Sequence, residues 1–144
     1  MNSTNPMQDT LALIGRILIA YFFVPSGFGK IAGFGGTVAY IAGKGIPLPE
    51  VCVAIAIAAE LGLGLLLLVG WQARWAALGM AIFVAIITPI FHNYWAVPAE
   101  QVAAQTMNFN KNMAILGGLL AFAAFGAGRF SLDGMRGRTE PAMA

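Results

Sequence analysis

The chain has few of the residues that soluble enzymes commonly use for catalysis. Only 10% of its residues are charged, and it contains one cysteine, Cys52, and one histidine, His92. A lone cysteine excludes an intramolecular disulfide, a C-x-x-C thiol relay and a cysteine-rich zinc or iron–sulfur site. A lone histidine without a second strong axial ligand argues against haem. Any redox chemistry therefore requires a bound cofactor or a partner.

Hydrophobic residues dominate the composition instead. They make up 59% of the 144 residues. Only 10% of the residues are charged, whereas in soluble domains the charged fraction is usually about a quarter. Several apolar stretches of about 20 residues are long enough to cross a hydrocarbon core about 30 Å thick. The composition therefore indicates an integral membrane protein, in which residues 1–144 form a single all-α membrane domain embedded in the lipid bilayer.

The apolar stretches predict a bundle of four transmembrane helices. Their expected bounds are about 9–27, 51–70, 75–92 and 111–130. The N-terminus lacks the basic segment and the cleavage site of a signal peptide, so we expect the first helix to be retained. We expect the C-terminal tail, residues 131–144, to be flexible.

Two of the connections are expected to form short helices. The glycine-rich but apolar segment between the first two helices predicts one around Thr37 to Ala42, lying at the interface or dipping inward as a lid. Between the third and fourth helices, Pro98 followed by Glu100 predicts a second short surface helix with the proline at its first position. Both connections would lie on the outer side of the membrane.

The basic residues indicate how the helices are oriented. One side of a four-crossing bundle would hold both termini and four arginines: Arg74, Arg129, Arg136 and Arg138. The other side would hold three lysines: Lys30, Lys44 and Lys111. Because basic residues favour the cytoplasmic side, we expect the N- and C-termini to be cytoplasmic. Scattered basic residues and a formal net charge of +2 point to membrane topology and not to nucleic acid.

Glu60 is the only charged residue in the predicted helix 51–70. A charge near the middle of a bilayer costs about 2.5 kcal/mol or more, so it usually has a partner or a function. Counting rises of about 1.5 Å per residue from the helix ends places Arg16 and Glu60 within about 6 Å of the same depth. We therefore expect an Arg16–Glu60 ion pair near the midplane. The alternatives are that this pair only fixes the helix register, or that Arg16 extends to the inner interface.

Further polar residues are expected to gather above this pair in a vestibule that opens outward. The full set of candidate ligand-binding residues is Arg16, Lys30, Glu60, His92, Asn108, Lys111 and Asn112. Glu60 is the candidate proton-transfer group, and no metal site is predicted. Structural explanations are open for each: interfacial anchoring for the lysines and His92, and hydrogen bonds between helices for the asparagines.

Four segments together resemble the DoxX family of small bacterial four-helix membrane proteins. They are GRILIAYFFVPSGFGKIAGF, GIPLPEVCVAIAIAAELGLGLLLLVGWQARWAA, FHNYW and NFNKNMAILGGLLAF, within about Leu11 to Phe130. The resemblance implies a bundle in the bacterial inner (plasma) membrane. The positions that match the family pattern here are Gly15, Arg16, Glu60, Asn108 and Asn112.

The family takes its name from a subunit of a thiosulfate:quinone oxidoreductase, and other members are linked to membrane redox complexes. The resemblance therefore implies a redox-associated membrane subunit more than a self-sufficient enzyme. Because the chain carries no companion soluble domain, a complete oxidoreductase does not follow from it.

Three functions are compatible with the sequence. The first is a site for a quinone or another small apolar ligand, with Glu60 available for proton transfer. The second is a non-catalytic membrane anchor or scaffold for a redox partner. The third is a small proton-coupled transporter that titrates Glu60 and needs a homo-oligomer to form a pathway.

Overall fold

The computed structural model describes residues 5–136, which are almost entirely helical and contain no strand. The long helices are α1 (Pro6–Ala32), α5 (Ala73–Phe91) and α6 (Ala99–Phe125). A fourth long segment is built from α3 (Pro49–Ile57), the π-helical η1 (Ala58–Leu63) and α4 (Gly64–Val69). The short elements are α2 (Phe34–Gly43), the 3-10 helix η2 (Tyr94–Ala96) and α7 (Leu132–Arg136). The prediction of an all-α membrane bundle is confirmed.

Three of the long segments have the length and composition of membrane spans. They are Pro6–Ala32, Pro49–Val69 and Ala73–Ala96, with mean hydropathies of 1.8, 2.5 and 1.9. The helix α6 has the same length as α1, 27 residues, but its first half is too polar to meet that description. It packs along α5, so the bundle has four long members, and the fourth membrane crossing stays a prediction.

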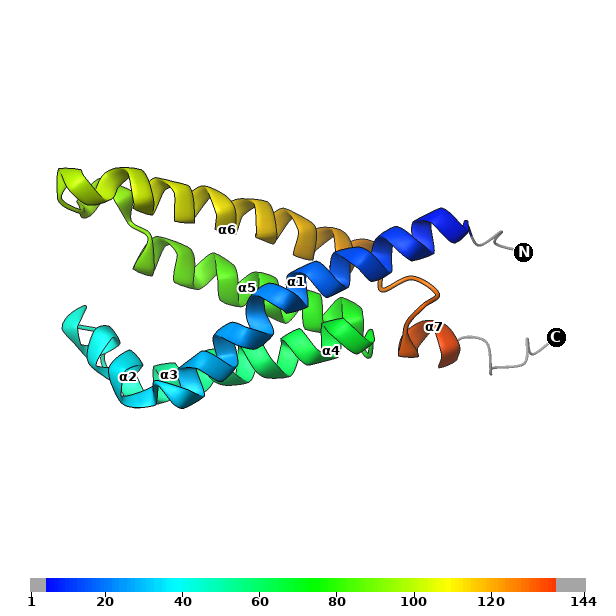
Figure 1. Cartoon of the computed structure of the whole chain (residues 1–144), viewed down its shortest axis with the longest axis horizontal. Coiled ribbons are helices and arrows are strands. Elements are labelled where there is room, and N and C mark those ends of the chain that lie inside the picture. The colour runs from blue at the N-terminus through cyan, green and yellow to red at the C-terminus, as the bar shows by residue number, and fades with distance from the viewer. Residues whose placement is uncertain (1–4, 137–144) are drawn as a thin grey trace.

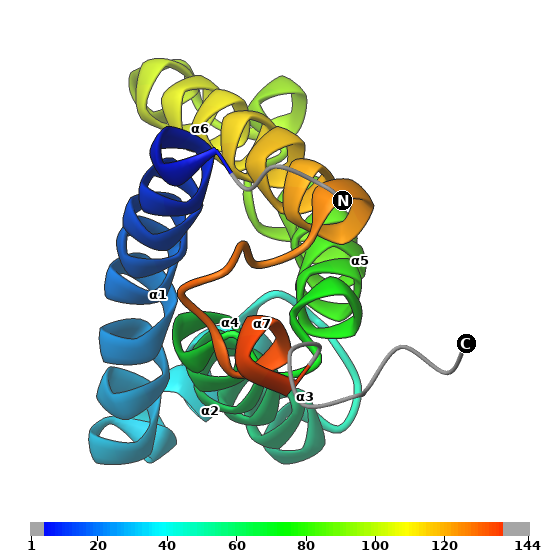
Figure 2. The same ribbon diagram turned by 90° about the vertical axis from the view of Figure 1, so that its right-hand side faces the viewer.

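The bundle has two dissimilar ends (Figure 1). At the terminal end, on the right of the picture, lie the start of α1, the turn Gly70–Gln72, the end of α6 and α7. At the splayed end, on the left, α5 and α6 diverge from α1 and α3, and α2 and the connection 92–98 are found there. Figure 2 looks onto the terminal end, where the link between α6 and α7 crosses the face of the bundle.

Local sequence explains where α1 begins and where α4 ends. The side chain of Asn5 accepts a hydrogen bond of 3.0 Å from the N–H of Met7, and Pro6 occupies the first helical position, where its missing N–H is harmless. The helix α4 ends because Gly70 adopts a left-handed conformation with φ of 70°, which side chains other than glycine rarely adopt.

Three of the predicted boundaries are wrong. The helix α6 starts at Ala99 and not near residue 111, so the predicted second surface helix is its first turns, and Pro98 is the residue before it. In those turns Gln105 Oε1 lies 2.9 Å from Nδ1 of His92, the residue that follows α5, which supports the helix there. Residues 132–136 of the tail form α7 instead of a flexible segment; residues 137–144 lie outside the described part. The predicted helix around 37–42 is confirmed as α2.

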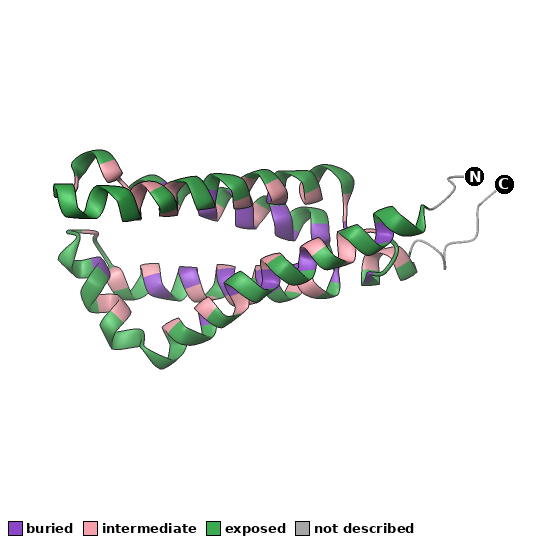
Figure 3. Ribbon diagram, turned by 45° about the horizontal axis from the view of Figure 1, so that its top comes forward, coloured by how far each residue is buried: buried purple, intermediate pink, exposed green. Residues whose placement is uncertain are grey.

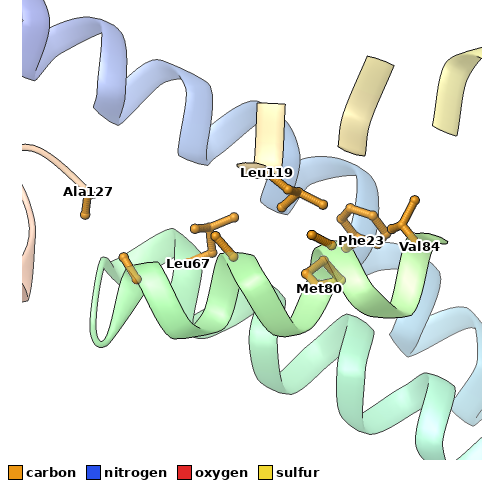
Figure 4. Close-up of a cluster of buried hydrophobic side chains, with 9 residues drawn as sticks. Phe23, Leu67, Met80, Val84, Leu119 and Ala127 are labelled. Atoms are coloured by element: carbon orange, nitrogen blue, oxygen red, sulfur yellow. The ribbon is translucent and has the colours of Figure 1, made fainter. Parts of the chain in front are cut away.

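The hydrophobic core is shared by all four long segments (Figure 4). Phe23 of α1, Leu67 of α4 and Leu119 of α6 meet Met80 and Val84 of α5, and all five are almost fully buried. Figure 3 shows buried residues mainly on the facing sides of the helices and exposed ones along their outer sides. In a membrane protein those exposed apolar sides face lipid.

Candidate functional site

One face of α1 carries most of its buried polar residues. Asp9, Arg16, Phe23 and Lys30 follow one another at intervals of seven residues, and residues so spaced lie on one face of a helix. Asp9, Arg16 and Phe23 are buried, and the Lys30 side chain is 26% exposed. Arg16 and Lys30 therefore share a face, as predicted, with Phe23 between them.

The same change from apolar to polar occurs on the other long segments. Toward the splayed end, the core residue Val84 is followed one turn later by Thr88, and Leu119 is preceded two turns earlier by Asn112. Glu60 similarly precedes the buried Gly64. We call Lys30, Glu60, Thr88 and Asn112 the polar layer: there is one residue from each long segment, and each lies on the splayed side of the core residues of its own segment.

Within the polar layer, Lys30 and Glu60 form an ion pair. The Lys30 Nζ lies 2.8 Å from Glu60 Oε2 and 3.0 Å from Oε1, and it also donates to Ser26 Oγ at 2.9 Å. Glu60 is 5% exposed and lies in the π-helical segment η1. π-Helical turns are rare and are often found at functional sites.

The close approach of α1 to η1 depends on Gly27. A Cβ atom at this position would lie 2.6 Å from Leu61 Cγ and 3.1 Å from the Leu61 N. No side chain fits there without moving one helix, because real Cβ contacts are wider. Gly27 thus brings Lys30, one turn further along α1, within reach of Glu60.

The expected Arg16–Glu60 pair is wrong. The Arg16 Nη1 donates to the carbonyl oxygen of Leu68 at 2.9 Å and to that of Leu67 at 3.4 Å, and its Nη2 donates to the carbonyl of Phe130. The last carbonyls of a helix have no intrahelical partner. Arg16 donates to two of those of α4, the carbonyls of Leu67 and Leu68, and ties them to the link before α7. Among residues 5–136, its Nε is the one buried side-chain nitrogen or oxygen without a hydrogen-bond partner.

The prediction failed because depth alone does not fix the direction of a long side chain. Both Arg16 and Lys30 lie on the face of α1 that contacts η1 and α4, so either could reach a carboxylate there. Free carbonyls at the terminal end hold the guanidinium, which has several donors, and Lys30 is left to neutralise Glu60.

The other two members of the polar layer join α5 to α6. Asn112 Nδ2 donates to Thr88 Oγ1 at 3.0 Å, and Thr88 Oγ1 donates to the carbonyl of Val84 at 2.6 Å. Thr88 is fully buried and Asn112 nearly so. Thr88 was not among the predicted site residues, although its position four residues before His92 on one helix face was a usable signal.

The remaining candidates lie nearer to the splayed end and to the surface. His92 Nδ1 lies 2.9 Å from Gln105 Oε1, and the exposed Lys111 donates to Asn108 Oδ1 at 3.1 Å. The Lys111 Nζ is 5.1 Å from the centre of the Phe22 ring of α1. His92 therefore ties the start of α6 to the end of α5, and Lys111 lies over the seam between α1 and α6.

The structure thus separates the predicted set into three groups. Lys30, Glu60 and Asn112 belong to the polar layer, which Thr88 completes. The second group, nearer to the splayed end and the surface, is His92, Asn108 and Lys111. The third is Arg16 alone, toward the terminal end. Across residues 5–136, no three His, Cys, Asp or Glu side chains are grouped to hold a metal ion.

Known proteins match most of this chain. The sequence profile of the DoxX family matches residues 11–93. The inner membrane protein YphA of Escherichia coli (strain K12) is 36% identical over 126 residues, which cover 88% of this chain and 90% of YphA. The inner membrane protein YqjF of the same strain is 34% identical over 127 residues, covering 88% and 92%. No solved structure matches the chain.

Proposed function

The chain belongs to the DoxX family of inner membrane proteins, and from this premise we propose that its polar layer binds a quinone or another small apolar molecule that carries a carbonyl group. The proposed activity is that of a membrane subunit: it holds the ligand and a proton-accepting group, and a separate redox partner supplies or removes electrons.

The observation that carries the proposal is the Lys30–Glu60 ion pair inside a largely apolar bundle. Burying an ion pair is expensive, and replacing one by well-packed apolar residues is often neutral or stabilising. In membrane helices, ionisable residues commonly mark ligand or proton pathways. Stability alone is therefore a weak reason for this pair.

The polar layer offers the groups that such a ligand needs. The Lys30 ammonium and the Asn112 amide are hydrogen-bond donors for a carbonyl oxygen. Glu60 is a carboxylate that can accept or return a proton when the oxygen changes its protonation state. The core residues Phe23 and Val84 precede Lys30 by seven residues and Thr88 by four on the same helices, so apolar and polar groups follow one another, as is typical of small-molecule sites.

Lys30 is placed to change its partner. Its side chain keeps 26% of its surface exposed and already shares its donors between Ser26 and Glu60. A ligand carbonyl could take the place of Ser26 without leaving Glu60 uncompensated. By contrast, Thr88 is fully buried, and we assign it the role of orienting Asn112.

The test is the quinone content of purified protein, extracted from a mild detergent and measured per chain by mass spectrometry. We expect Glu60→Gln and Asn112→Ala each to lower the content several-fold, because one hydrogen bond to a ligand contributes about 1 kcal/mol. Matched controls are Glu50→Gln and Asn110→Ala, which change exposed residues of α3 and α6. His92→Ala and Lys111→Ala should have smaller effects.

The outcome also decides between this function and a scaffold. Equal quinone and lipid content in wild type, Glu60→Gln and Asn112→Ala, at equal folded fraction, contradicts a ligand site. The polar layer would then only lock the helices, and the protein would be an anchor for its partner.

We also propose that the terminal end faces the cytoplasm, which its arginines support through the positive-inside rule. A fluorescent protein fused after Ala144 should then be bright and alkaline phosphatase fused there inactive. The reverse pattern places the polar layer toward the cytoplasm.

A further inference from the structure

The short helix α2 lies at the splayed end of the bundle, on the same side of the core as the polar layer. Only Gly33 separates it from α1, and residues 44–48 lead from its end to α3. Figure 1 shows it on the left, reaching from the end of α1 toward the end of α5. It therefore connects two long segments that otherwise diverge at this end.

Two aromatic rings join α2 to α5. The ring of Tyr40 is stacked on that of Phe91, the last residue of α5, with the ring centres 6.0 Å apart and 23° between the planes. The Lys44 Nζ lies 5.4 Å from the centre of the Tyr40 ring and 6.0 Å from that of Phe91. Stacked rings attract each other, and a cation near their faces adds to the attraction. We call these three residues the ring contact.

The rest of α2 is weakly anchored. Ile41 is its one buried residue, at 5% exposure, whereas Tyr40 is 54% exposed. Gly33 precedes the helix, and Gly45 follows shortly after it with φ of 73°. Glycine gives the backbone more freedom than other residues do, and segments with few buried apolar side chains open at low free energy. The helix α2 is therefore built to move while the long helices keep their places.

The position of α2 relates it to both pairs of the polar layer. Lys30, which pairs with Glu60, lies three residues before Gly33 in the last turn of α1. Thr88, which binds Asn112, lies three residues before Phe91 on α5. The helix α2 thus links the ends of the two helices that carry these pairs.

We propose that α2 is a lid over the polar layer. It turns about Gly33 and Gly45, and the ring contact with Phe91 holds it closed. This inference rests on the function proposed above, since the lid sets how fast the small apolar ligand enters and leaves. The lid opens toward lipid, because the segment Phe34–Gly43 contains no charged residue and can move within the membrane.

The test measures how fast N-ethylmaleimide reacts with a cysteine placed in the polar layer. Thr88→Cys supplies the thiol, and Cys52→Ser removes the natural one. Thr88 is fully buried, so the reaction requires a transient opening. We expect Tyr40→Ala to raise the rate about fivefold, and Tyr40→Phe, which keeps the ring, to leave it unchanged. Phe91→Ala should act like Tyr40→Ala, and the two together should add little, because both rings make one contact.

Two controls separate a lid from a general loosening of the bundle. Tyr21→Ala removes a ring that is 78% exposed on α1 and should leave the rate unchanged. A thiol introduced by Ala77→Cys, in the core part of α5, should react no faster when Tyr40→Ala is added. Equal acceleration at the Ala77 position would mean that the whole bundle has loosened. That result overturns the proposal, as does an unchanged rate for Thr88→Cys in the presence of Tyr40→Ala.

The link to the ligand is tested separately, by the release of pre-bound decylubiquinone from protein with its natural Thr88. We expect Tyr40→Ala to speed the release about fivefold and to change the amount bound at equilibrium little, because a lid alters entry and release alike. Faster labelling with unchanged release would contradict the role of α2 in ligand exchange. If no decylubiquinone binds, the function proposed above fails, and the labelling rates still decide whether α2 opens.

Discussion

At the terminal end, Arg16, Asp9 and Asp133 all bind main-chain groups, whereas at the splayed end the polar layer is held together mainly by bonds between side chains. The three terminal residues satisfy N–H and C=O groups that helix ends and turns leave unpaired. Removing one of them takes a hydrogen-bond partner from these main-chain groups, most of which are partly buried.

The splayed end is built on a different principle. Lys30 satisfies Glu60, and Asn112 satisfies Thr88, so each pair can exchange a bond for a ligand without exposing the backbone. The helices also diverge there. The comparison teaches that polar residues of one bundle can serve different purposes. Those of the terminal end hold main-chain groups in place, and those of the splayed end form side-chain pairs that can exchange a hydrogen bond for a ligand.

The largest expected effect is at the terminal end. Arg16→Met should destabilise the protein by about 3 kcal/mol or more, since it removes a fully buried side chain and leaves the partly buried carbonyls of Leu68 and Phe130 without their donor. Unfolding in mixed detergent micelles, followed by circular dichroism, measures this. Arg74→Met, which changes an exposed arginine of the same end, should stay within about 0.5 kcal/mol. Equal losses in the two variants would contradict the role of Arg16 in stabilising the terminal end through its hydrogen bonds to main-chain carbonyls.

A double-mutant cycle then sharpens the contrast between the ends. Lys30→Met and Glu60→Gln should show a coupling free energy of about 1–3 kcal/mol, because the two side chains form one partly buried ion pair. The corresponding cycle of Arg16→Met with Glu60→Gln should be additive within about 0.5 kcal/mol, since these side chains have no shared partner. Strong coupling in the second cycle would mean that Arg16 and Glu60 interact after all, and it would contradict the difference drawn here between the two ends of the bundle.

The last test concerns the spacing of α1 and η1. Gly27→Ala should cost about 1–3 kcal/mol, because its Cβ meets Leu61 and pushes Lys30 away from Glu60. The matched control is Gly29→Ala, which has open space around its Cβ and should be neutral or stabilising by up to about 1 kcal/mol. Apparent melting temperature in detergent measures both. Similar values for the two alanine variants would show that the splayed end tolerates a change of helix spacing.

Sequence patterns were sufficient for most of the fold and for three members of the polar layer, Lys30, Glu60 and Asn112, but not for Thr88 or for the contacts that the layer makes. The apolar stretches located α1, the segment from α3 to α4, and α5, and the face shared by Arg16 and Lys30 followed from their spacing. The early start of α6 was missed because its first turns are polar, and polar helical turns need tertiary partners such as His92 for Gln105. The helix α7 was missed because it exists through Asp133, which binds residues 60 positions away.

By itself, the sequence determined the class of the protein, because apolar stretches long enough to cross a bilayer must form helices that satisfy their own backbone bonds. It also determined that a carboxylate, Glu60, would be buried among them. Only the tertiary structure decided which cation neutralises it. Arg16 and Lys30 lie on the same face of α1. Which of them pairs with Glu60 depends on where helix-end carbonyls accept hydrogen bonds and on the close approach of α1 to η1 at Gly27, and both are properties of how separate segments meet.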